Sequence, residues 1–269
     1  MLSAVARRRN SRNILVTMQV GPHCFAVTGL GYVPPWCVNA GFVVGSHTTL
    51  VVDTGANALA AATIHGYASV ARPENRVIVI DTEKHFDHIG GNSYFRERGI
   101  DVYGHAGIER TDQEFCCEIA GFNSQISDPA RRARGEEKAF YTATSLTNPN
   151  RPILEDMTLD LGDCAVQVLL TPGHTPTNLS VYVPHDGVLF CGDCLINEYM
   201  PNLDCGTEPD WRQWLVSLDR IVQLAPNAVV PGHGPVAIGS DVGRIIETVR
   251  NELERSIASG LSWAALDSV

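Results

Sequence analysis

Short apolar runs separated by turn residues dominate the first third of the chain. Gly21-Pro22 and Gly45-Ser46 fall between successive runs, and such residues are typical of the tight turns that join antiparallel strands. The pattern therefore predicts consecutive strands in hairpins at residues 14–20, 24–28, 38–44 and 48–52.

The pattern changes after the fourth run, where Asp53-Thr54-Gly55 ends the strand and an alanine-rich stretch at 56–70 predicts a helix. Residues 76–80 are rich in β-branched side chains, which is typical of a strand buried on both faces. The second half alternates in the same way, with strands expected at 158–161, 166–170, 180–183, 188–191 and 228–230 and amphipathic helices at 211–224 and 241–259. Two strand-rich halves with flanking helices predict an α/β fold, a four-layer αββα sandwich of two stacked sheets.

Periodicity weakens between residues 105 and 157, where charged and helical pieces occur around 113–119 and 128–141. Long irregular segments in a compact domain often cover a functional face. We therefore expect one domain over residues 1–269, with an insertion at about 105–157 that forms a lid or a wall of the substrate site.

Composition narrows the function classes. Hydrophobic residues make up 44% of the 269 residues, which is enough for a buried core. The net charge of -10 argues against nucleic acid as a partner, because phosphates require a basic face. The first residues resemble no signal peptide and no apolar run is long enough to span a bilayer, so we expect a cytoplasmic protein without membrane contact.

The cysteines do not form a recognisable zinc motif. Cys191 and Cys194 have C-x-x-C spacing, but the chain has no second pair to complete a four-sulfur site. Zinc or redox use is the alternative to the interpretation that we prefer, buried and reduced thiols near a strand end.

Four side chains of the types that commonly bind metals follow the strand at 76–80 within six residues. They are Glu83, His85, Asp87 and His88. Such a density of ligand-type residues directly after a buried strand is hard to explain by packing, because strand ends commonly position functional groups. This cluster indicates a metal site.

Three further residues of this kind lie in turns after later strands. His174 and His233 each follow a Pro-Gly pair, which fixes the direction of the imidazole. Asp193 follows a buried run that ends in glycine, where an aspartate is also a common turn former. We expect His65, His105 and His185 to lie outside the metal site.

Together these residues resemble the metallo-β-lactamase superfamily, whose motif H-x-H-x-D-H precedes a lone His, a bridging Asp and a late His. Neighbouring residues such as Thr82, Gly90-Gly91 and Asp53-Thr54-Gly55 also match, and the similarity runs from about residue 38 to the last helix. One position departs from the pattern: Glu83 stands where the family has its first histidine.

The resemblance implies an αββα sandwich that binds two divalent metal ions. One ion would take Glu83, His85 and His174, and the other would take Asp87, His88 and His233, with Asp193 bridging. Zinc is the expected metal, although a carboxylate at position 83 makes iron or manganese more favourable. Alternatively, the exchange weakens the first site and leaves a single ion, or Glu83 is no ligand and lies on the surface or behind the ligands.

The resemblance also implies hydrolysis of a small-molecule substrate of ester, lactone, thioester or amide type by a metal-bound hydroxide. In this interpretation Asp87 is catalytic, because it orients the hydroxide besides binding metal. Two other functions stay open. The ligand set also suits a non-haem (di)iron oxidoreductase, and the exchange at Glu83 also suits a catalytically silent metal-binding protein.

Overall fold

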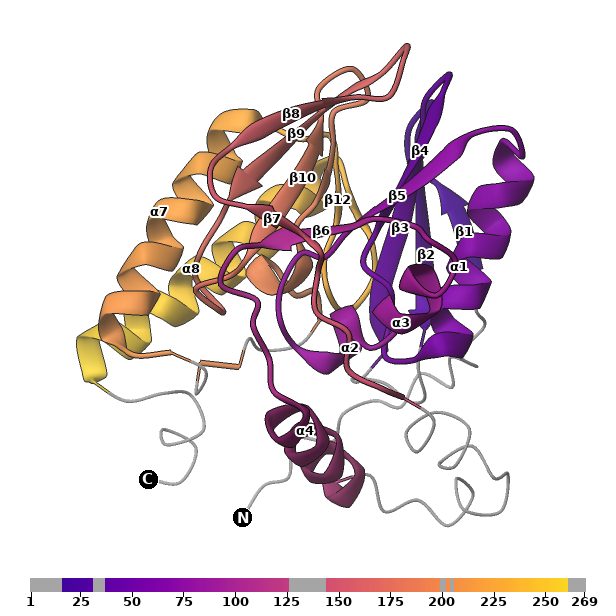
Figure 1. The fold of residues 1–269 in the computed structure, drawn as a ribbon. Helices are drawn as coiled ribbons and strands as arrows, with labels where there is room; N and C mark the ends of the chain where they lie inside the picture. Colours follow the sequence, from indigo (N-terminus) through magenta and orange to yellow (C-terminus); the bar gives the residue numbers. More distant parts are fainter. Residues whose placement is uncertain (1–15, 31–36, 126–143, 199–201, 204–205, 261–269) are drawn as a thin grey trace.

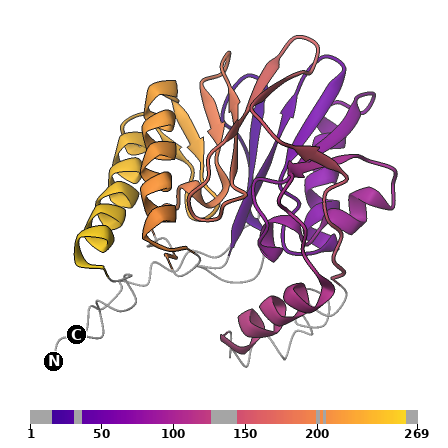
Figure 2. The ribbon, with the colours of Figure 1, turned by 60° about the vertical axis from the view of Figure 1, so that its left-hand side comes forward.

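Two β-sheets stack face to face, with helices on both outer sides (Figures 1 and 2). The computed structural model describes residues 16–30, 37–125, 144–198, 202–203 and 206–260. Within these residues the order of layers is helix, sheet, sheet, helix, which confirms the four-layer αββα sandwich that the sequence predicts.

The first sheet has seven strands in the order in which they follow along the chain. The first four form an antiparallel meander and the remaining three pair in parallel. The strands are β1 (Val16–Gln19), β2 (Cys24–Leu30), β3 (Val38–Val44), β4 (Thr48–Val52), β5 (Arg76–Ile80), β6 (Val102–His105) and β7 (Arg151–Ile153). Helices α1 (Ala58–Ala71) and α3 (Asn92–Arg96) lie on its outer side (Figure 1).

The second sheet has six strands in the order β13-β12-β11-β10-β9-β8. Only β11 and β12 pair in parallel; the other pairs are antiparallel. The strands are β8 (Met157–Asp160), β9 (Ala165–Leu170), β10 (Leu179–Val183), β11 (Val188–Phe190), β12 (Ala228–Val230) and β13 (Ala237–Ile238). Helices α7 (Glu208–Leu224) and α8 (Ser240–Ser259) cover its outer side (Figure 2).

Three apolar layers hold these elements together. Residues of both sheets, among them Leu50, Val181 and Phe190, fill the space between the sheets. Outside the first sheet α1 buries its alanine-rich face, and outside the second sheet α7 and α8 bury apolar faces. Burial on both sides explains why strands such as β5 carry continuous apolar runs instead of alternating ones.

The expected insertion contributes one strand to the first sheet. β7 pairs in parallel with β6, so the sheet extends into residues that we assigned to the insertion. Helix α4 (Asp112–Gln125) lies apart from the sheets and packs Phe115 and Ile119 against Phe86 and Ile89. The helical piece expected at 128–141 falls outside the described residues.

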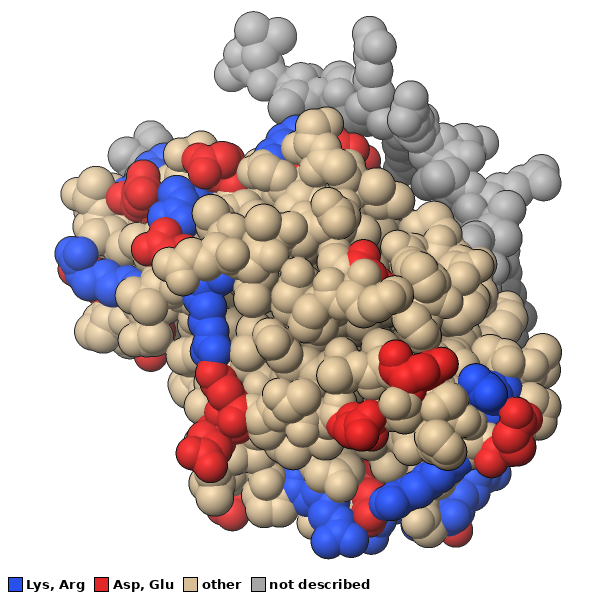
Figure 3. All heavy atoms as spheres, turned by 90° about the horizontal axis from the view of Figure 1, so that it is seen from above, with Lys and Arg blue, Asp and Glu red and all other residues tan. Residues whose placement is uncertain are grey.

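One end of the sandwich carries a mixture of acidic and basic side chains (Figure 3). Figure 3 views the molecule from the end that is uppermost in Figure 1, and there Lys and Arg alternate with Asp and Glu without forming a continuous basic band. Among the described residues, no helix combines the length and the apolar character that crossing a bilayer requires.

Candidate metal centre

All seven residues that the sequence singles out meet at one edge of the sandwich. Those from the first sheet follow β5, because Glu83 and His85 lie in the loop and Asp87 and His88 in the short helix α2 (Phe86–Ile89). Those from the second sheet follow three other strands: His174 after β9, Asp193 in the 3-10 turn after β11, and His233 after β12. The strand ends thus bring distant segments together.

Ligand atoms of Glu83, His85, His174 and Asp193 lie within 4.8 Å of one another. His85 Nδ1 is 2.7 Å from Glu83 Oε1 and 3.3 Å from His174 Nε2. Asp193 Oδ2 is 3.5 Å from His174 Nε2. These four residues form the first group.

Asp87, His88 and His233 form the second group, again within 4.8 Å. His233 Nε2 is 3.3 Å from Asp87 Oδ2 and 3.4 Å from Asp193 Oδ1. Asp193 Oδ1 is also 3.3 Å from His88 Nε2. One oxygen of Asp193 thus faces each group, which is the placement that a bridging ligand requires.

Three imidazoles are fixed by hydrogen bonds on the side away from the centre. The Nδ1 of His174 donates to the Asn202 carbonyl oxygen at 3.1 Å, and that of His233 donates to the Cys37 carbonyl oxygen at 3.0 Å. The Nδ1 of His88 lies 2.9 Å from an Asp53 carboxylate oxygen. Each ring therefore directs Nε2 into the centre, as metal-binding histidines do when their other nitrogen is anchored.

Asp53 is a functional residue to which the sequence analysis gave no role beyond ending a strand. Its backbone has a φ of 61°, and its buried carboxylate accepts hydrogen bonds from the backbone N–H and the hydroxyl of Thr82, both at 2.7 Å. The same carboxylate accepts from His88. One sequence signal could have identified Asp53. It is an acidic residue directly after a buried strand, β4, and β4 pairs with β5, the strand that precedes the cluster.

Glycine permits the close approach of the two turns from the second sheet. A Cβ on Gly232 would overlap the Asp193 carboxylate and the backbone of Gly192. The glycine before His233 thus allows close packing against Asp193 and also helps to fix the direction of the imidazole.

The carboxylates of the centre are ionised. Burial alone would raise the pKa of each, but the imidazoles outweigh it. His85 and His174 lower the pKa of Glu83, whereas His88 and His233 lower the pKa of Asp87 to about 2. The imidazoles of His233 and His88 also hold the pKa of Asp193 well below its usual range.

The surroundings shift the pKa values of three histidines in different directions. Burial disfavours their charged forms, and it lowers the pKa of His174. At His88 burial is outweighed by the carboxylates of Asp53, Asp193 and Asp87 together, which raise the pKa well above its usual range. Asp193 and Asp87 raise the pKa of His233 to about 10. Protons on two imidazoles thus occupy the role that bound cations would take.

The residues present fit divalent cations. Among the described residues, Glu83 Oε2 lacks a hydrogen-bond partner, and His88 Nε2 and Asp193 Oδ1 make no hydrogen bond beyond ion-pair contacts of 3.3 and 3.4 Å. Unpartnered buried polar atoms cost about 1–3 kcal/mol each, so a fold rarely keeps several in one place without a ligand. Imidazole and carboxylate donors also match zinc, iron and manganese. The Glu83 side chain is fully buried, so it is not a surface residue.

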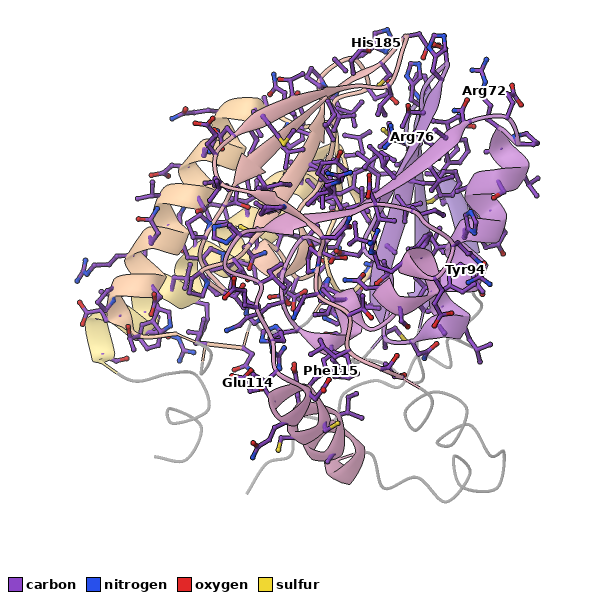
Figure 4. All side chains as sticks on the ribbon, in the orientation of Figure 1. Arg72, Arg76, Tyr94, Glu114, Phe115 and His185 are labelled. Carbon is purple, nitrogen blue, oxygen red and sulfur yellow. The ribbon has the colours of Figure 1, made fainter. Side chains whose placement is uncertain are left out.

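Helix α4 contacts the loop that carries the first group. Glu118 accepts a hydrogen bond from Arg110 at 2.6 Å, and Arg110 donates to the Lys84 carbonyl oxygen at 2.7 Å. Phe115, labelled in Figure 4, lies on the side of α4 that faces the sheets. Glu118 also accepts a long hydrogen bond of 3.5 Å from the Phe86 backbone N–H, so the helix is attached to the backbone on either side of His85.

The C-x-x-C pair belongs to the packed interior beside Asp193. Cys191 and Cys194 are buried and free of disulfides, which confirms the expectation of reduced thiols. Burial raises the pKa of Cys194 to about 12, so its thiol is protonated. Cys205 lies outside the described residues.

Comparisons with known proteins agree with this geometry. The chain is 30% identical over 90 residues to the Beta-lactamase-like protein 2 homolog of Caenorhabditis elegans, a match that covers 34% of this chain and only 28% of that protein. It is 25% identical over 204 residues to the Acyl-coenzyme A thioesterase MBLAC2 of Gallus gallus, which covers 72% of each.

Solved structures share the fold. A metallo-beta-lactamase family protein of Thermus thermophilus superposes with a TM-score of 0.65 at 20% identity, over 90% of this chain and 82% of that one. A sequence model of the metallo-beta-lactamase superfamily matches residues 33–233, a range that includes all seven residues of the centre. The chain therefore belongs to the metallo-beta-lactamase superfamily, with glutamate in place of the first histidine of the metal motif.

Proposed function

We propose that the protein is a metal-dependent hydrolase with two divalent cations that acts on an acyl bond of a small molecule. The observation that carries the proposal is the placement of Asp193, whose Oδ2 faces His174 of the first group and whose Oδ1 faces His88 and His233 of the adjoining second group. Glu83, His85 and His174 would hold one cation, and Asp87, His88 and His233 the other.

The chain's own residues support hydrolysis in the following way. Divalent cations held here would lower the pKa of water from 15.7 to about 7 and polarise a substrate carbonyl. His88 and His233 lower the pKa of Asp87 to about 2, so at neutral pH its carboxylate can orient an attacking water and accept its proton. His233 holds Asp87 in place through the contact at Oδ2. Asp53 and Thr82 keep His88 directed into the centre.

Thioesters are the first substrates to test. One relative that aligns over most of its length bears the name of an acyl-coenzyme A thioesterase, and another bears the name of a metallo-beta-lactamase. A thioester, an ester, a lactone and an amide-type ring all present a carbonyl carbon to the same attack, so a panel of all four separates the substrate classes.

The test combines metal content with turnover. Elemental mass spectrometry of protein purified without added metal gives identity and stoichiometry, and the panel gives activity. Asp193→Ala should lower both the metal content and the turnover, because the bridge between the groups is lost. His105→Ala serves as the control, since its imidazole lies outside both groups. Unchanged metal content in Asp193→Ala would contradict the assignment.

A second candidate is a non-haem (di)iron oxidoreductase, which the buried carboxylate of Glu83 favours. With Glu83 the centre offers four imidazoles and three carboxylates, a harder donor set than the histidine-rich motif of the family. Iron as the main metal, together with oxygen consumption and no turnover of the panel, would favour this candidate. Bound metal without either activity would favour a catalytically silent protein.

A further inference from the structure

A second cluster of ligand-type residues lies at the opposite end of the sandwich. It consists of His23 in the β1–β2 turn and His185 and Asp186 in the β10–β11 turn. β10 begins after His174 and β11 ends before Asp193, so their turn is at the far end from the metal centre. Figure 4 labels His185 at the upper edge, whereas Figure 1 places α2 in the lower half.

Both imidazoles direct a nitrogen at the same carboxylate oxygen. Asp186 Oδ1 is 2.9 Å from Nδ1 of His23 and 3.1 Å from Nδ1 of His185. The two rings stand edge to face with their centroids 5.3 Å apart. Ligand atoms around a tetrahedral zinc ion are separated by about 3.3 Å when each lies about 2.0–2.1 Å from the metal. The carboxylate oxygen is thus close to that spacing from each imidazole nitrogen, and all three atoms lie within 4.8 Å of one another.

The fold fixes the carboxylate in this direction. The side chain of Asp186 is fully buried, and its Oδ2 accepts a hydrogen bond of 2.7 Å from the backbone N–H of His23. A Cβ on Gly21 would lie 2.6 Å from that oxygen, so glycine is needed for the turn to approach so closely. Oδ2 is therefore anchored, and Oδ1 is left to face the imidazoles.

The surroundings suit a cation with water as a further ligand. The side chain of His185 is 67% exposed and that of His23 is 18% exposed, so solvent reaches the cluster from one side. Each histidine follows a proline, Pro22 or Pro184, which limits the freedom of the turn that presents it. Two imidazoles and one carboxylate are donors for zinc and other borderline divalent cations.

We propose that His23, His185 and Asp186 bind one divalent cation of the zinc class and so link the two sheets at the end remote from the metal centre. His23 belongs to the first sheet and the other two residues to the second, with His23 and Asp186 163 positions apart in the chain. The role is structural, because the cation would bridge two hairpins that otherwise meet through hydrogen bonds. This differs from our expectation from sequence, which placed His185 among the residues that bind no metal.

The test counts zinc ions in the full-length protein after equilibration in a zinc buffer. His185→Ala should bind one ion fewer per chain than the wild type, and the fold should tolerate this change because the exposed ring contributes little packing. His47→Ala is the matched control, since His47 is an exposed imidazole in another hairpin turn and lies outside the cluster. Equal stoichiometry in all three proteins would overturn the proposal.

Thermal unfolding provides a second readout that does not depend on turnover. Zinc should raise the Tm of the wild type more than that of His185→Ala, because a ligand that binds only the folded state stabilises it. Equal increases in Tm in the two proteins would mean that the cluster forms hydrogen bonds only and binds no zinc. In Asp193→Ala the zinc bound by this cluster should persist, so failure at the metal centre and failure here are distinguishable.

Discussion

Glu83 is the residue at which this chain leaves the pattern of its family. Its carboxylate is buried, one oxygen lies 2.7 Å from His85 Nδ1, and the other has no hydrogen-bond partner among the described residues. A glutamate that served only packing would not leave a buried oxygen unpartnered among imidazoles. On the proposed assignment, Glu83 therefore takes the place of a ligand and changes the donor from nitrogen to oxygen.

Replacement of Glu83 by histidine should change which metal the protein retains. Imidazole favours zinc, whereas carboxylate shifts preference towards iron and manganese, so Glu83→His should raise the zinc share in protein purified from the same medium. Elemental mass spectrometry measures this share. Glu83→Gln is the companion variant, because it keeps the shape, removes the charge and should lower the total metal content. An unchanged metal profile in both variants would exclude Glu83 from the first group.

Asp53 acts on the centre through His88. Asn tolerates a φ of 61° better than most residues, so Asp53→Asn should keep the backbone while removing the charge that His88 faces. Loss of such a partner typically weakens metal binding about 10–100-fold. Competition with a chelator measures the affinity, and Asp163→Asn, at an exposed acid, is the control. Equal affinity in the two variants would argue against the positioning role.

Among the elements, α4 connects the segment after β6 to the loop that carries Glu83 and His85. Glu118→Ala would leave Arg110 without its partner at 2.6 Å while the helix keeps its apolar contacts. A part-buried charge that loses its hydrogen bond costs about 1–3 kcal/mol, so the free energy of unfolding should fall by about that amount. Chemical denaturation of the metal-loaded protein tests this, with Glu109→Ala as the exposed control.

The sequence predicted best those elements that a continuous apolar run marks, whatever their length. The strands at 38–44, 48–52, 76–80 and 228–230 end where predicted, because continuous apolar runs and adjacent turn residues mark them locally. β7, β13 and α2 were not predicted, since two to four residues carry no period and form only by pairing with or packing on distant segments.

The same distinction applies to the centre. Its seven ligand-type residues were recognisable from local motifs, and the structure brings them together. The groups that orient them were not recognisable. Asp53, Asn202 and the Cys37 carbonyl oxygen reach the imidazoles only through tertiary approach, with sequence separations of 28 to 196 residues.

At the scale of the whole molecule, the metal centre spans the two sheets. Glu83, His85, Asp87 and His88 follow a strand of the first sheet, whereas His174, Asp193 and His233 follow strands of the second. Cations held between them would stabilise the association of the two halves, because ligands that bind only the folded state favour it. Removal of metal by a chelator should therefore lower the Tm.

The decrease in Tm on removal of metal should become larger as the pH rises. Without cations, Asp193 and Asp87 outweigh burial and raise the pKa of His233 to about 10. A group with a raised pKa contributes stability that is fully present below its unfolded value, about 6.5, and is lost as the pH rises towards about 10. The metal-free protein should thus lose stability over this range.

The metal-loaded protein should respond in the opposite sense. A cation must displace the protons on His88 and His233, so its affinity increases as the pH rises. Both effects widen the difference in Tm between metal-loaded and chelator-treated protein from about pH 6 to about pH 9. Calorimetric scans of the two forms at each pH measure it. A difference that stays constant or narrows would show that cations and protons do not compete for these imidazoles.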